Sequence, residues 1–167
     1  MSMRRWIHVA AACLALLLGA CEDSDHCTCP PGKVDPPMSD LSVTWERGNI
    51  FASLMPIVPP DPIVCRAWLI LENENEREAF SELAVPTADV ILARNDSTLG
   101  VIPIETDWNG ILASGQRDTI VFFKNTGPVP IFTPPCGQRV LVDFMIQNAD
   151  GEARIFRSDT LTFECAF

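Results

Sequence analysis

Hydrophobic and polar side chains alternate along much of the chain after residue 40. A period of two residues is typical of a strand that buries one face. Residues that favour turns, such as Asn109-Gly110 and Asp150-Gly151, separate the alternating runs. Seven strands are predicted, at residues 41–55 (with a bulge or break at Gly48), 63–72, 88–94, 99–104, 119–124, 138–148 and 152–164.

Short strands separated by turns predict an all-β domain, and we expect an antiparallel two-sheet sandwich with an immunoglobulin-like arrangement. A small β-barrel is the alternative. The one segment with helical character is 73–83, where Ala79, Phe80 and Leu83 would share a short apolar face.

The last two predicted strands form a hairpin, because Asp150-Gly151 suits a two-residue type I′ turn. The buried face of the first strand is then Val140, Val142, Phe144 and Ile146. The expected cross-strand pairs are Val140 with Leu161, Phe144 with Arg157 and Ile146 with Ile155. Further out, Cys136 faces Cys165 as a closely spaced pair, which predicts a disulfide. Cys65 is the competing partner, because its strand begins at the same end of such a sandwich.

The first 20 residues follow a different pattern. Arg4 and Arg5 precede an apolar run at 7–18 that is broken only by His8. This run is shorter than the roughly 20 residues that a membrane-spanning helix needs. A basic head, a short apolar middle and a small-residue exit are typical of a cleaved export signal.

The exit sequence Leu18-Gly19-Ala20-Cys21 resembles the lipobox of bacterial lipoproteins. The resemblance covers the first 21 residues. It implies that the Cys21 thiol receives a diacylglycerol and that the chain is cut just before it. A plain secretory signal cut near Ala20, with Cys21 in a disulfide, is the alternative interpretation.

The lipoprotein interpretation divides the chain into a signal at 1–20, an acidic, proline-rich tether at 21–40 and one domain at 41–167. It predicts a location at the bacterial cell envelope, held on the membrane by the N-terminal lipid. Glu22 and Asp23 follow the acylated cysteine. Because Asp directly after that cysteine is the inner-membrane retention signal of the class, we expect the outer membrane, with the inner membrane as the alternative.

The formal net charge is −10, and removal of residues 1–20 takes away Arg4 and Arg5 but no acid, so the charge becomes −12. Such a surface repels nucleic acid and anionic headgroups. We therefore expect no nucleic-acid partner, and a domain that stands away from its membrane.

Cys27 and Cys29 lie in the tether beside His26. Soft thiolates bind copper(I) or zinc, so these residues are weak candidates for a metal carrier. A zinc site needs about four ligands at wider spacings, and a disulfide, for example to Cys65, is the favoured interpretation.

No histidine or tyrosine occurs at 41–167, which excludes a Ser-His-Asp or Cys-His centre in the domain. Nucleotide-binding and HExxH motifs are also missing from the sequence. We expect no enzyme activity and no cofactor, and predict a binding or assembly module that contacts another envelope protein. The alternative is a hydrolase using carboxylates alone, for which the acidic run is Glu72, Glu74, Glu76, Glu78 and Glu82. We interpret that run as a solvated edge or loop. Trp45, Trp68 and Trp108 could form a ligand platform, but we expect them to be core or partly buried residues.

Overall fold

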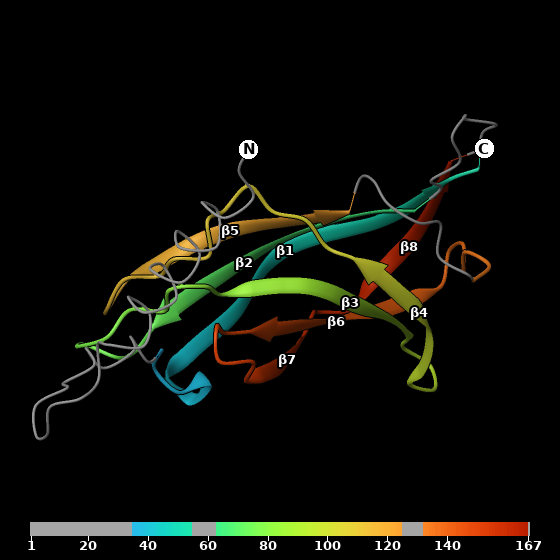
Figure 1. Ribbon diagram of the computed structural model, residues 1–167. Coiled ribbons are helices and arrows are strands. Elements are labelled where there is room, and N and C mark those ends of the chain that lie inside the picture. Colours follow the sequence, from blue (N-terminus) through green and yellow to red (C-terminus); the bar gives the residue numbers. More distant parts are fainter. Residues whose placement is uncertain (1–34, 55–62, 125–131, 167) are drawn as a thin grey trace, which may run out of the picture. The chain divides into compact units, whose positions relative to one another are not determined.

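The computed structural model describes residues 35–54, 63–124 and 132–166 (Figure 1). Apart from the short 3-10 turn η1 (Met38–Asp40), every regular element in these residues is a strand, as predicted. The strands are β1 (Leu41–Ser53), β2 (Ile63–Asn73), β3 (Ala84–Leu92), β4 (Ser97–Pro103), β5 (Arg117–Lys124), β6 (Arg139–Gln147), β7 (Ala153–Arg157) and β8 (Leu161–Ala166). The predictions for Cys21, His26, Cys27 and Cys29 lie outside the described residues.

The strands join into one mixed sheet with the order β4-β3-β6-β8-β1-β2-β5, and β7 is added beside β6. β8 connects the two halves. It pairs antiparallel with β6 at Val140–Leu161 and parallel with β1 from Ile50–Phe163 onward. β4 and β5 lie at opposite ends of the order, so the sheet does not close and the barrel alternative is wrong.

Alternating burial explains why these segments are strands. The four predicted core positions of β6 (Val140, Val142, Phe144 and Ile146) are all fully buried. Buried positions also alternate along β2, and both strands contribute to the same hydrophobic cluster. The rings of Trp45 on β1 and Phe144 on β6 lie 6.3 Å apart, which ties the two halves of the sheet together.

β1 is continuous through Gly48, and its bulge lies two residues earlier, at Glu46. The pairing with β2 jumps from Trp45–Leu69 to Arg47–Trp68, which leaves Glu46 unpaired. The predicted bulge at Gly48 was therefore misplaced. Gly48 has a different role, because a Cβ there would lie 2.5 Å from the Trp45 ring and 2.8 Å from the Arg66 carbonyl oxygen.

The hairpin register differs from the prediction by one residue near its turn. Phe144 pairs with Phe156, and Ile146 pairs with Arg154. The loop holds three residues, because Asn148 and Glu152 close it: the Asn148 N–H donates to the Glu152 carbonyl (3.0 Å), and the Asn148 Oδ1 accepts from the Glu152 N–H (2.9 Å). Gly151 takes the left-handed conformation (φ 82°) that such loops need.

The one-residue shift in register is reversed further along the hairpin. Ser158 interrupts the second strand, its N–H donating to Val142 O (2.9 Å) and its hydroxyl accepting from Val142 N–H (2.8 Å). Beyond this interruption Val140 pairs with Leu161, as predicted.

Segment 73–83 does not form the expected helix. The buried Asn73 side chain donates to the carbonyl oxygens of Glu78 (2.8 Å) and Ala113 (3.1 Å), and the Asn75 Oδ1 accepts from the Arg77 N–H (2.9 Å). Asparagine side chains that satisfy backbone groups in this way favour turns over helix. Phe80 still reaches the core through a bridge to Leu112.

Candidate functional site

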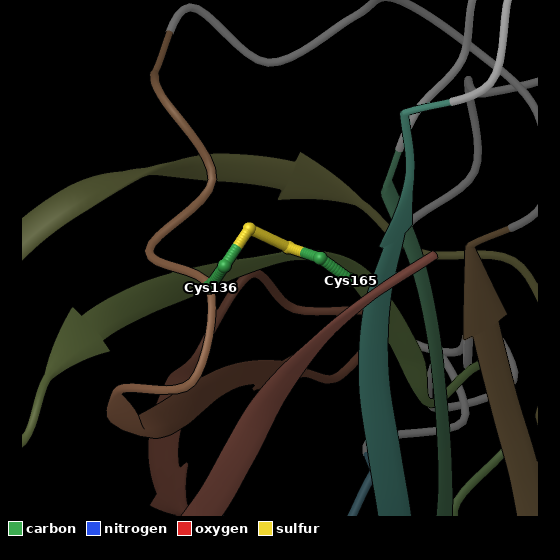
Figure 2. The surroundings of a disulfide bond; sticks show 2 residues. All are labelled: Cys136 and Cys165. Carbon is green, nitrogen blue, oxygen red and sulfur yellow. A yellow bond between two sulfur atoms is a disulfide. The ribbon is translucent and has the colours of Figure 1, made fainter. Parts of the chain in front are cut away.

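Cys136 and Cys165 form a disulfide bond, as the sequence predicts, with their Cα atoms 5.5 Å apart (Figure 2). The bond joins the turn before β6 to the end of β8. Backbone bonds beside it hold the same two segments together: the Gly137 N–H donates to Phe163 O (2.8 Å), and the Phe163 N–H donates to Gln138 O (2.9 Å). The disulfide therefore reinforces the pairing of β8 with the start of β6.

Among the described residues, Cys65, the competing partner, has no disulfide partner and its thiol is free. It lies on β2 opposite Lys124 of β5 and is 1% exposed. Burial raises the pKa of Cys65 to about 12, although the positive charge of Lys124 opposes part of that rise. The thiol is protonated at neutral pH, so Cys65 is an inert core residue and no nucleophile.

The outward face of β1 and β2 carries an open groove of about 510 Å³. We call it the Trp68 groove. Its lining residues are Arg47, Gly48, Asn49, Phe51, Val64, Arg66 and Trp68. Their positions follow from strand pairing, which places Arg47 beside Trp68, Asn49 beside Arg66 and Phe51 beside Val64.

Two guanidinium groups flank the indole of Trp68. The Arg47 Cζ lies 4.6 Å from the ring centroid and the Arg66 Cζ lies 6.0 Å from it. Cation–π contact holds flexible arginine side chains beside a rigid ring, which lowers the entropy lost when a partner binds. Tryptophan and arginine are also the residues most enriched where protein interfaces derive their affinity.

Sequence reasoning did not single out this groove. All three tryptophans are partly buried, as expected: Trp45 and Trp108 pack against the core, and Trp68 lies on the opposite face of β2. The signal that was missed is the alternation along β2, where Arg66 and Trp68 occupy the positions between the buried Cys65, Ala67 and Leu69. An arginine and a tryptophan in phase on the outward face predict a surface feature.

A second, smaller groove of about 270 Å³ lies on the outward face of β3 and β6. Asp89 and Asp143 are cross-strand neighbours in it, beside the exposed side chains of Val101 and Ile155. The carboxylate of Asp143 accepts two hydrogen bonds from Arg157, from Nε (2.8 Å) and Nη2 (2.9 Å). These bonds raise the pKa of Arg157 above its ordinary value.

The glutamate run does not gather into a cleft in the described part of the chain. Glu72 on β2 forms an ion pair with Arg117 (3.5 Å), and Glu74, Glu76 and Glu78 lie exposed in the turns that follow. Glu82 is also exposed, and it is the one member of the run among the described residues that line a pocket. This arrangement agrees with our interpretation of the run as a solvated edge and loop. The two aspartates that are cross-strand neighbours in a groove, Asp89 and Asp143, are far apart in the sequence and were not predicted.

Among residues 35–54, 63–124 and 132–166, no group of three or more His, Cys, Asp and Glu side chains is placed to hold a metal ion. In the same residues, no helix has the length and apolar character required to cross a bilayer. No family model matches the chain, and no curated protein is significantly similar to it in sequence.

Proposed function

We propose that this protein is a bacterial lipoprotein, attached to the cell-envelope membrane through a diacylglycerol on Cys21 and exposed in an oxidising compartment. The lipobox-like sequence Leu18-Gly19-Ala20-Cys21 supports the attachment. The Cys136–Cys165 disulfide supports export independently, since disulfides persist outside the reducing cytosol. The outer membrane is the proposed location.

We further propose that the domain is an immunoglobulin-like sandwich. β2 pairs with β5 in one half of the sheet, and β4, β3, β6 and β7 are neighbours in the other. Strands B and E, and strands C′, C, F and G, have the same neighbours in an immunoglobulin-like fold. In Figure 1, β1, β2 and β5 run together on one side and β3, β6 and β7 on the other, which supports two layers.

The domain functions as a binding module that contacts another envelope protein through the Trp68 groove. The observation that carries this proposal is the pair of arginines held over Trp68 on a half-exposed sheet face. Both charged residues among the described lining residues, Arg47 and Arg66, are basic, in a chain whose formal net charge is −10. The partner surface that fits presents carboxylates together with apolar side chains.

Site-specific crosslinking tests this interface. With a photoreactive amino acid at Asn49, intact cells should yield a discrete adduct, and Trp68→Ala should reduce its amount about tenfold or more, as loss of an interface anchor does. Thr98, an exposed residue on β4 and separated from β1 by three strands in the order of the sheet, is the matched control position and should yield no such adduct. An Asn49 adduct that is indifferent to Trp68→Ala would contradict the proposed interface.

The carboxylate hydrolase remains a second candidate, because Asp89 and Asp143 are neighbours on β3 and β6 in one groove. Two carboxyl groups about 5 Å apart are the requirement of a retaining glycosidase. Both oxygens of Asp143 already accept hydrogen bonds from Arg157, which favours a structural ion pair. Glycan hydrolysis by the purified protein that is abolished by Asp89→Asn would establish the enzyme and displace the binding proposal.

A further inference from the structure

A separate cavity of about 440 Å³ lies where β3 ends and β6 begins. We call it the Arg94–Arg139 pocket. Its lining residues are Leu92, Ala93, Arg94, Gln138, Arg139 and Thr160. It shares no residue with the Trp68 groove or with the Asp89–Asp143 groove.

Backbone bonds fix three walls of this pocket. The Ala93 N–H donates to Arg139 O (3.0 Å), which continues the pairing of β3 with β6 beyond Leu92–Val140. Val140 pairs with Leu161, and this pairing places Thr160 at the same end of the sheet.

The disulfide restrains the side of the pocket that contains Gln138. Cys136 is two residues before Gln138, and the Gln138 carbonyl accepts from the Phe163 N–H (2.9 Å), two residues before Cys165. Leu92 and Arg139 are strand residues, and the other four described lining residues each lie within two residues of a strand end, so the paired strands position them.

The described lining of the pocket is positively charged, although the chain as a whole is negatively charged. The chain has 22 Asp and Glu residues and 12 Lys and Arg residues, but both charged residues that the structure describes in the pocket lining are arginines. Within the described part of the chain, neither the Arg94 nor the Arg139 guanidinium forms an ion pair or a hydrogen bond. Two uncompensated cations beside a hollow attract an anion.

The donor groups indicate which anion fits. One guanidinium fork satisfies a planar carboxylate, whereas two forks together with the Thr160 hydroxyl and the Gln138 amide match an anion with four tetrahedral oxygens. We propose that the Arg94–Arg139 pocket binds a phosphate group. The phosphate belongs either to a soluble compound or to the headgroup of a membrane lipid.

A binding titration tests the pocket. The full-length chain, with its disulfide intact and in mild detergent, is titrated with inorganic phosphate at about 0.15 M ionic strength, where exposed charges are largely screened. Saturable binding is expected, and Arg94→Gln or Arg139→Gln should each weaken it about tenfold or more, because each removes charge-assisted hydrogen bonds. Arg77→Gln, an exposed arginine outside the pocket, is the matched control and should bind as the wild type does.

A second titration, with short-chain phosphatidylglycerol below its micellar concentration, distinguishes the two sources. Tighter binding than inorganic phosphate, lost in both pocket variants, assigns the pocket to a lipid headgroup. Equal or weaker binding assigns it to a soluble phosphate. No saturable binding of either probe, or an equal loss in Arg77→Gln, would overturn the proposal.

Discussion

Cys65 carries a thiol, a group that can act as a nucleophile, but its surroundings in the fold keep it unreactive. Its thiol lies inside the core, among the alternating buried positions of β2, and opposite Lys124. Burial removes water from the charged form of the thiol, and this raises its pKa to about 12. An unfolded chain has no such penalty, so the protonation of Cys65 couples to folding.

The sign of that coupling gives a pH prediction. Between the ordinary thiol pKa of 9.0 and about 12, Cys65 stays protonated in the folded chain and loses its proton in the unfolded chain. The free energy of unfolding should therefore fall with rising pH in this window, by up to about 1.4 kcal/mol per pH unit from this residue.

Chemical denaturation at pH 8 and pH 10.5, with the disulfide intact, measures the effect. Cys65→Val, which removes the thiol but keeps a similar volume, should show the smaller loss of stability over this interval. Equal losses in the two proteins would show that Cys65 does not titrate as its burial requires.

At the scale of elements, the sequence predicts the features that depend on the alternation of hydrophobic and polar residues. The core face of β6, Val140 to Ile146, follows from period-two burial. The turn at Asp150-Gly151 was recognised but assigned two residues, because this dipeptide alone does not show that Asn148 and Glu152 close a three-residue loop. The helix expected at 73–83 failed for a different reason, since buried Asn73 has a hydrogen-bond partner in a distant segment, which local sequence does not show.

The candidate sites also divide into one that the sequence predicts and two that it does not. The disulfide could be predicted, because one hairpin brings Cys136 and Cys165 together. The Trp68 groove and the Arg94–Arg139 pocket combine residues from separate strands, and local patterns do not determine which strands become neighbours.

The disulfide also makes a stability prediction for the β6–β8 unit. It closes a loop with a sequence separation of 29 residues. The double variant Cys136→Ser/Cys165→Ser should unfold with about 2–4 kcal/mol less free energy than the oxidised wild type, mainly because the unfolded chain gains freedom.

Urea denaturation with and without a reductant measures this difference. Reduction should lower the stability of the wild type toward that of the double variant and leave the variant itself unchanged. A difference of less than about 0.5 kcal/mol would show that the bond does not constrain the unfolded chain as loop closure requires.

At the scale of the whole molecule, charge and attachment define the account. The proposed lipid on Cys21 holds an acidic chain at a membrane whose anionic headgroups repel it, so the domain remains accessible to partners. Two concave features, the Trp68 groove and the Arg94–Arg139 pocket, are each lined by a pair of arginines. In this view the lipid supplies location, the groove supplies a protein contact and the pocket supplies an anion contact.

Acylation of Cys21 is the claim on which that account depends, and metabolic labelling with an alkyne-bearing fatty acid tests it most directly. The wild-type chain should carry the label and sediment with membranes, Cys65→Ser should behave in the same way, and Cys21→Ser should lose the label and the membrane association together. An unlabelled wild-type chain, or a Cys21→Ser chain that keeps its label, would contradict the account.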